Sequence, residues 1–279
     1  MKKTALSLIT LALASGAAVA QTAPAAPAAP EPESTLSYNI GVVTDYRYRG
    51  ISQSSRNPAV QVGVDYAHKS GFYVGAWHST IQWISDNSVV GPVRSTVKGG
   101  GELDIYGGYK GEITKGFGYD VGILRYEYLG NNLEDTGGTK YGVYDNANTT
   151  EVYGALTFGM FTAKYSLSTT PLFGASSFDG GVRKTSAGSG YLDLNATVDL
   201  GNGLSVVPHL GAQQVANVNA ARYNDYSVTL AKDYGNGFVA SGAWVSTNAD
   251  PSANGYYIRP ADNKPLGEAA LVLGLKYTF

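Results

Sequence analysis

The last residues of the chain, GEAALVLGLKYTF at positions 267–279, carry the pattern that decides the fold. Apolar and aromatic residues alternate with smaller or polar ones, which is the period of a β-strand with two different faces. One face holds Leu271, Leu273, Leu275, Tyr277 and Phe279, and the other holds Val272, Gly274, Lys276 and Thr278. This pattern is typical of a strand in a membrane barrel, whose outer side contacts lipid. The alternative is an edge strand of a soluble sandwich.

Similar alternating segments recur from Leu36 onward, each followed by a turn. In the clearest one, 37–49, we expect an outward face of Tyr38, Ile40, Val42, Thr44, Tyr46 and Tyr48, and an inward face of Asn39, Gly41, Val43, Asp45, Arg47 and Arg49. With the terminal strand, the predicted strands number twelve: 37–49, 59–67, 72–81, 102–110, 119–128, 150–158, 161–168, 191–200, 204–213, 225–232 and 238–247. The alternation breaks near Arg125 and Glu127, so their direction stays open.

The connections between these strands alternate between short and long. The short ones are 68–71, 111–118, 159–160, 201–203 and 233–237, and the long ones are 50–58, 82–101, 130–149, 169–190, 215–224 and 248–266. Outer-membrane barrels have short periplasmic turns, long external loops and an even number of strands. A soluble sandwich has no reason to sort its loops in this way. We therefore predict an all-β protein, a transmembrane antiparallel up-and-down β-barrel of about twelve strands over residues 36–279, with both termini periplasmic.

The first 35 residues have a different composition. Lys2 and Lys3, an apolar run at 5–13 and a small-residue site ending at Ala20 predict a signal peptide over residues 1–20. Residues 21–35, QTAPAAPAAPEPEST, are rich in Pro and Ala and predict an extended periplasmic tether.

Charge and composition exclude several classes of function. Cleavage would remove two of the 20 basic residues and none of the 22 acidic ones, leaving a net charge of −4. This weak acidity gives no reason to expect nucleic acid as a partner. The chain has no Cys, which excludes disulfides, thiolate metal sites and cysteine catalysis. The three His are not spaced like a metal site and no phosphate loop is present, so we expect neither a metal nor a cofactor.

Period two also predicts which charged residues point into the barrel, many of them near the external mouth. The predicted pore-lining residues are Asp45, Arg47, Arg49, Asp65, Glu102, Asp104, Glu151, Lys164, Asp193 and His209. Such a mixed set can narrow a water-filled pore and set its ion preference. It can equally be structural, with arginines pairing with carboxylates across a crowded interior. The excess of acids in the ring at the mouth favours cations.

Three functions remain open at this point. The first is a narrow outer-membrane channel for passive diffusion of small polar solutes or ions. The second is a closed barrel that anchors its external loops for adhesion or assembly, which a lumen plugged by residues 82–101 would favour. The third is an outer-membrane hydrolase, which would need a Ser hydroxyl within reach of His209. His78 and Ser79 cannot form such a pair because adjacent strand residues point to opposite faces.

Several stretches resemble a known family. They are DYRYRGISQ at 45–53, GVDY at 63–66, SGFYVG at 70–75 with Trp77, ELDIYGGY at 102–109, YDVG at 119–122, EVY at 151–153 and YLDLN at 191–195. Together they are similar to the TorF-type family of porins, and the resemblance implies an outer-membrane barrel. The terminal strand ending in Phe279 also resembles the C-terminal signal of bacterial outer-membrane proteins. This implies two partners, outer-membrane lipid and the barrel-assembly machinery.

Overall fold

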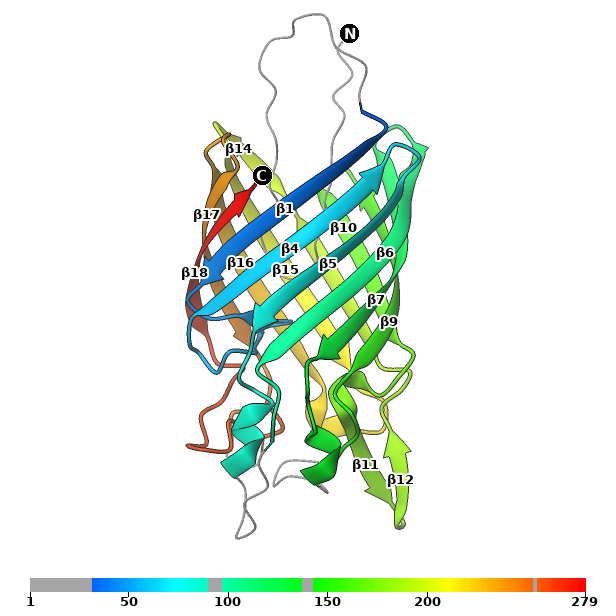
Figure 1. The fold of residues 1–279 in the computed structure, drawn as a ribbon, viewed down its shortest axis with the longest axis vertical. Helices are drawn as coiled ribbons and strands as arrows, with labels where there is room; N and C mark the ends of the chain where they lie inside the picture. The colour runs from blue at the N-terminus through cyan, green and yellow to red at the C-terminus, as the bar shows by residue number, and fades with distance from the viewer. Residues whose placement is uncertain (1–31, 90–96, 137–142, 253–254) are drawn as a thin grey trace, which may run out of the picture.

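A computed structural model describes residues 32–89, 97–136, 143–252 and 255–279. The predicted signal peptide at 1–20 and most of the predicted tether at 21–35 lie outside these ranges. Within them the chain forms a closed antiparallel β-barrel of twelve strands, as predicted (Figure 1). The wall begins at Ser34, two residues before the predicted boundary.

The wall strands follow one another around the barrel in chain order. They are β1 Ser34–Val43, β4 Ala59–His68, β5 Phe72–Thr80, β6 Gly101–Thr114, β7 Phe117–Tyr128, β9 Thr149–Phe158, β10 Phe161–Ser168, β13 Gly190–Ala196 continued by β14 Val198–Gly201, β15 Leu204–Gln214, β16 Tyr223–Asp233, β17 Phe238–Thr247 and β18 Ala270–Thr278. Both β13 and β14 pair with β15, so they act as one strand interrupted at Thr197. The sheet closes because the terminal strand β18 pairs with both β17 and β1.

The outer surface of this barrel is apolar, as the alternation predicted. Leu271, Leu273 and Leu275 of β18 are 68%, 52% and 58% exposed. Exposed Val, Ile, Leu and aromatic side chains continue around the other wall strands at every second position. A continuous apolar outer face with polar residues inside is the arrangement of barrels that contact lipid.

The two ends of the barrel differ, as the loop lengths predicted. The five short connections lie at the end where β1 begins and the chain ends at Phe279 (Figure 1). The opposite end carries the long connections, which contain η1 Ser85–Val89, η2 Leu133–Thr136, η3 Leu172–Gly174, η4 Asn219–Ala221 and a small sheet of β8 Val143–Tyr144, β11 Ala175–Asp179 and β12 Val182–Thr185. Among the described residues, no helix has the length and apolarity needed to cross a membrane.

The prediction that residues 37–49 form one continuous strand was wrong. β1 ends at Val43, and the chain then turns into the barrel as the short strands β2 Arg47–Tyr48 and β3 Ile51–Ser52. Tyr46 and Tyr48, predicted to face outward, are 1% and 8% exposed and lie in the interior. The alternation was real, but it belongs to a hairpin inside the barrel and not to its wall.

Arg125 and Glu127, whose direction the sequence left open, lie on the outer face of β7. The register of β7 against β9 runs without a bulge from Phe117 to Tyr126, which sends Tyr126 inward. The Arg125 Nη2 lies 2.9 Å from Glu127 Oε2, and both side chains are more than a third exposed.

The contacts between the first and last strands allow a test of whether the terminal strand is needed for assembly of the barrel. The Phe279 ring stacks on Tyr38 of β1 and on Tyr277, with centroids 5.9 Å and 5.7 Å apart. Replacing Tyr277 and Phe279 with Ala removes both contacts and that of Tyr277 with Phe238, each worth about 1 kcal/mol, at the pairing that closes the sheet. We expect a lower yield of heat-modifiable, folded barrel in membranes.

The matched control is Phe161→Ala, because Phe161 is similarly exposed, at 57% against 65% for Phe279, but starts an internal strand. A normal yield of folded barrel from the double variant would contradict the role of the terminal strand.

Candidate functional site: a hairpin across the lumen

The segment that enters the barrel is a tight hairpin, which we call the lumen hairpin (residues 45–54). Tyr48 pairs with Ile51, so Arg49 and Gly50 form a two-residue turn. Their φ angles are 47° and 78°, both in the left-handed region that such a turn requires. A left-handed conformation is costly for a residue with a side chain, so its presence at Arg49 indicates that the surrounding contacts hold it.

One buried carboxylate fixes the base of the lumen hairpin. Asp45 accepts hydrogen bonds from Arg47 Nε at 2.8 Å and from the hydroxyls of Ser52 and Ser54 at 2.5 Å and 3.3 Å. The Ser54 hydroxyl also accepts from the backbone N–H of Tyr46 at 2.9 Å. Asp45 and Arg47 therefore hold the hairpin in shape and do not reach the opposite wall.

Arg49 at the tip reaches the far side of the barrel. Its Nη2 donates to Glu151 on β9 at 2.7 Å, and its Nη1 donates to Gln213 on β15 at 2.8 Å. Its guanidinium lies over the ring of Tyr191 on β13, 4.1 Å from the centroid. β9 and β13 flank β10, which lies six strands from β1 in either direction around the wall, and β15 pairs with β13. The lumen hairpin therefore spans the lumen from side to side.

Tyrosines of the first arm attach the hairpin to the wall. The hydroxyls of Tyr48 and Tyr126 lie 2.5 Å apart, and Tyr46 donates to Glu102 Oε1 at 3.2 Å. The Tyr46 ring also packs edge to face on Trp77, with centroids 5.4 Å apart. Hydrogen bonds and ring packing therefore tie the hairpin to β5, β6 and β7 as well.

A second polar cluster lies deeper in the lumen, around His209 of β15. His209 Nε2 lies 2.8 Å from Asp225 Oδ1, and Nδ1 lies 3.1 Å from Asp193 Oδ1 and 3.0 Å from Asn195 Oδ1. The Tyr191 hydroxyl donates to Asp225 at 3.0 Å and connects this cluster to the tip of the hairpin. In the described part of the chain, no Ser hydroxyl hydrogen bonds with His209, so the hydrolase prediction has no nucleophile there.

Further polar residues follow toward the end with the short turns. Asp65 on β4 accepts from the Tyr106 hydroxyl at 2.5 Å, and Tyr73 donates to Asp120 at 2.6 Å. Lys164 on β10 lies 3.9 Å from the centroid of the Tyr153 ring. Asp65, Asp120 and Lys276 are half-buried, in contrast to the fully buried residues at the level of the hairpin.

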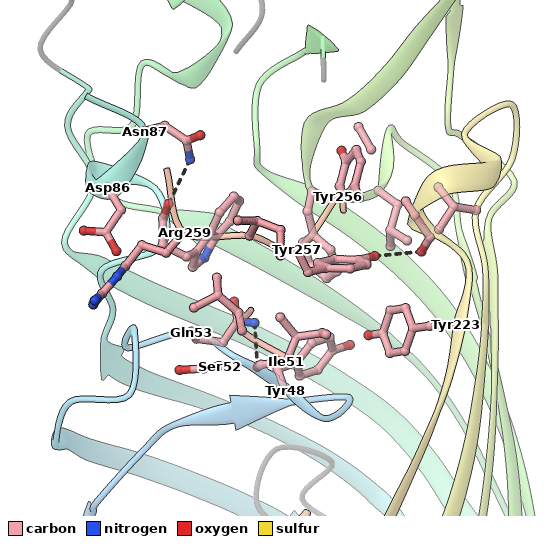
Figure 2. Close-up of a pocket in the computed structure, with 18 of the residues that line it drawn as sticks. Tyr48, Ile51, Ser52, Gln53, Asp86, Asn87, Tyr223, Tyr256, Tyr257 and Arg259 are labelled. Carbon is pink, nitrogen blue, oxygen red and sulfur yellow. Dashed lines mark hydrogen bonds between the residues drawn. The ribbon is translucent and has the colours of Figure 1, made fainter. Parts of the chain in front are cut away.

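On the other side of the lumen hairpin lies a small cavity of about 90 Å³. Figure 2 shows Tyr48 and Ile51 of the hairpin on one side of it and Tyr256 and Tyr257 of the last long loop on the other. Its remaining lining includes Trp83, Tyr144, Phe173 and Tyr223. The described residues of the long loops therefore lie over the hairpin and enclose a small space rich in aromatic side chains.

The ten predicted lumen residues fall into separate groups. The structure brings together Arg49 with Glu151, Glu102 with Asp104, and Lys164 with Asp193 and His209. It leaves Asp65 apart from them and places Asp45 and Arg47 inside the hairpin. The sequence reading missed Gln213, Tyr191 and Asp225, although period two in their strands placed all three on the inner face.

The chain matches one protein family over residues 26–279, described as Gcw_chp, bacterial proteins of unknown function. The chain belongs to this family. A search of curated proteins gives no match. The Gcw_chp description names no activity.

Solved structures similar to this Gcw_chp chain are outer-membrane porins and channels. The NanC porin has a TM-score of 0.54 at 10% identity, over 87% of this chain and 99% of that one. The KdgM porin has a TM-score of 0.49 at 8% identity, over 88% and 99%. An outer-membrane channel from Pseudomonas putida F1 has a TM-score of 0.45 at 11% identity, over 92% and 99%. At these identities the NanC likeness supports the barrel fold alone.

The seat of the hairpin tip can be tested at Gly50. A Cβ atom there would lie 2.5 Å from Thr247 Cγ2 and 2.8 Å from Asp225 Cβ, so Gly50→Ala must displace the hairpin. Gly116 is the matched control, because its φ of 80° is nearly the same and nothing lies within 4 Å of its Cβ position. Both changes incur the cost of a left-handed Ala, and only Gly50→Ala adds overpacking of about 1–3 kcal/mol.

Unfolding of the two variants in detergent micelles measures this difference. We expect Gly50→Ala to be clearly less stable than Gly116→Ala. Equal losses of stability would show that the tip is not seated against β16 and β17.

Proposed function

We propose that this protein is a channel of the bacterial outer membrane for small polar solutes or ions, and that the lumen hairpin controls its opening. The observation that carries the proposal is the presence of half-buried charged side chains on the inner face, between the hairpin and the short turns. Asp65, Asp120 and Lys276 point inward there and remain half-buried, with small residues such as Gly41 and Gly274 between them. A barrel that served only as a scaffold has no need of accessible charged groups along its axis.

The hairpin explains how such a lumen stays narrow. Arg49 and Glu151 form a buried ion pair whose side chains are 5% and 2% exposed. Breaking a buried pair by removing one partner costs about 3–5 kcal/mol, because the other charge is left uncompensated. The lumen hairpin is therefore a latch held by one ion pair and several tyrosine contacts, and passage requires its displacement.

The charges around the hairpin favour cations. Glu151 neutralises Arg49, and Asp45 neutralises Arg47, whereas no basic side chain is ion-paired with Glu102 or Asp104 among the described residues. Carboxylates that line a pore attract cations and repel anions. We propose a preference for cations and for solutes with a cationic group.

The proposal also includes the location of the protein in the outer membrane and the removal of its signal peptide. The apolar outer face and the barrel fold support insertion in the outer membrane, and the resemblance to TorF-type porins agrees with it. The signal peptide at 1–20, the tether at 21–35, the periplasmic termini and recognition of Phe279 by the barrel-assembly machinery stay predictions from the sequence. The external surface would then be the end with the long loops.

A closed barrel that anchors external loops is the second candidate. It is favoured by the same hairpin, since it spans the lumen and the long loops converge over it. The plug predicted for this case was residues 82–101, part of which lies outside the described residues. Segment 45–54 enters the barrel, and Ile84 and Val97 from the described part of the predicted plug pack in the same buried cluster as Tyr46 and Tyr48. A hydrolase has less support, because His209 is surrounded by carboxylates, an amide and a tyrosine.

Conductance in planar bilayers separates channel from anchor. Arg49→Ala removes the ion pair and leaves Glu151 buried without its partner. This destabilises the closed position of the hairpin by about 3 kcal/mol. The ratio of open to closed channels should then rise roughly a hundredfold. We expect rare, short openings of the wild-type protein and frequent openings of Arg49→Ala, with a reversal potential in a salt gradient that indicates cation preference.

Arg125→Ala is the control, since Arg125 is also ion-paired but lies on the outer face. It should conduct like the wild type. If both the wild type and Arg49→Ala insert as folded barrels and neither conducts, the channel proposal fails and the anchor takes its place.

A further inference from the structure

Two neighbouring carboxylates on β6 have fewer partners than their burial requires. Glu102 and Asp104 are 1% and 0% exposed and share the inner face of the strand. Within the described part of the chain, neither Oδ1 nor Oδ2 of Asp104 has a hydrogen-bond partner, and Glu102 Oε2 has none. Only Glu102 Oε1 is satisfied, by the Tyr46 hydroxyl of the lumen hairpin. Three buried carboxylate oxygens are thus left unpaired in one place.

Among the described residues, the side chains next to this pair on the adjacent strands carry no positive charge. On the adjacent strands Asp104 lies between Trp77 and Tyr126, and Glu102 lies between Ser79 and Tyr128. The arginine of the hairpin tip, Arg49, is held by Glu151 and Gln213. An ionised carboxylate buried without a counter-charge is strongly unfavourable, so this pair is stable only if it is protonated or compensated by a cation from solution.

We propose that Asp104 and Glu102 bind a small monovalent cation of the size of Na⁺ or K⁺ at the contact between the lumen hairpin and the wall. The inference deepens the proposed channel function, on which it rests, by naming an ion and a site for it. Carboxylate oxygens are the ligands that hard cations prefer. The rings of Tyr46, Trp77 and Tyr126 surround the pair, and aromatic faces attract cations as well.

A divalent ion fits this site less well. Ca²⁺ takes six to eight oxygen ligands, usually with several carboxylates. Among the described residues no group of three or more acidic, His or Cys side chains is placed to hold a metal ion. Glu151, the third acid at this level, is already paired with Arg49. A monovalent cation needs no third acidic side chain, and the three unpaired oxygens of these two carboxylates can serve as part of its ligands.

The test is thermal unfolding of the purified protein in detergent micelles, in KCl, NaCl and N-methylglucamine chloride at equal ionic strength. A ligand that binds only the folded state raises the Tm, so we expect a Tm several degrees higher in K⁺ or Na⁺ than in the bulky cation. Asp104→Asn should abolish this difference. In N-methylglucamine chloride it should also unfold no earlier than the wild type, because it removes an uncompensated buried charge.

Asp65→Asn is the matched control, since Asp65 is an inward-facing acid whose oxygens accept from Tyr106 and Asn39. It should keep the wild-type response to K⁺ and Na⁺. Glu102→Gln, which should weaken the response, replaces Asp104→Asn if the latter does not fold. A wild-type Tm that is the same in all three salts, or a response that persists in Asp104→Asn, would overturn the proposal.

Other outcomes separate this site from the channel itself. A Tm raised by CaCl₂ far more than by KCl, in a manner that depends on Asp104, would overturn the choice of a monovalent ion. A barrel that never conducts but keeps the Asp104-dependent response would remove the channel and leave the cation site. Conductance that persists in the absence of any such response would remove the site alone.

Discussion

The structure depends on the closure of one sheet. A strand that faces lipid cannot leave backbone N–H and C=O groups unpaired, because the bilayer core offers no water to satisfy them. Here β1 meets β18, so the first and last strands have partners on both sides. Closure divides every strand into an outer face that has to be apolar and an inner face that can be polar. Charged residues of the wall such as Asp104, Glu151 and Asp225 are therefore gathered inside, where they have to be paired, hydrated or bound to an ion.

This confinement explains the lumen hairpin. A chain segment inside the barrel needs partners for its polar groups, and the inner faces of the wall supply them on every side. Arg49 finds Glu151 and Gln213, and Tyr46 and Tyr48 find hydroxyl and carboxylate partners on β6 and β7. The left-handed turn at Arg49 and Gly50 is stable only in these surroundings. The wall and the hairpin are therefore one polar network inside an apolar shell.

Most of the wall could be predicted from the sequence, because period two and loop length are local signals. Residues 267–279 alone indicate the strand type, and the sorting of loops by length indicates the barrel. The hairpin could not be predicted in the same way, since Asp45 to Arg49 alternate as a wall strand does. The difference lies in their tertiary contacts, because Tyr46 and Tyr48 form hydrogen bonds with polar groups of wall strands inside the lumen. A local signal existed in Arg49-Gly50, because a residue followed by Gly between two alternating pairs suits a two-residue turn. The partners Gln213 and Asp225 lie far from the hairpin in the sequence. Only the closed barrel brings them close to it, so they could not be predicted from local patterns.

The free energy that holds the lumen hairpin in place limits how often the proposed channel can open. If breaking the Arg49–Glu151 pair costs about 3 kcal/mol, a hairpin held by it alone would be open less than about 1% of the time. The tyrosine contacts lower that fraction further. Salt has little effect on a pair buried at 5% and 2% exposure, so ionic strength alone does not open it. In the proposed channel, a solute that passes has to supply part of this free energy itself, by offering a cationic group to Glu151 or an anionic group to Arg49. The unpaired carboxylates Glu102 and Asp104 beside the hairpin favour the cationic case, because a cation gains two partners there once the hairpin has moved away.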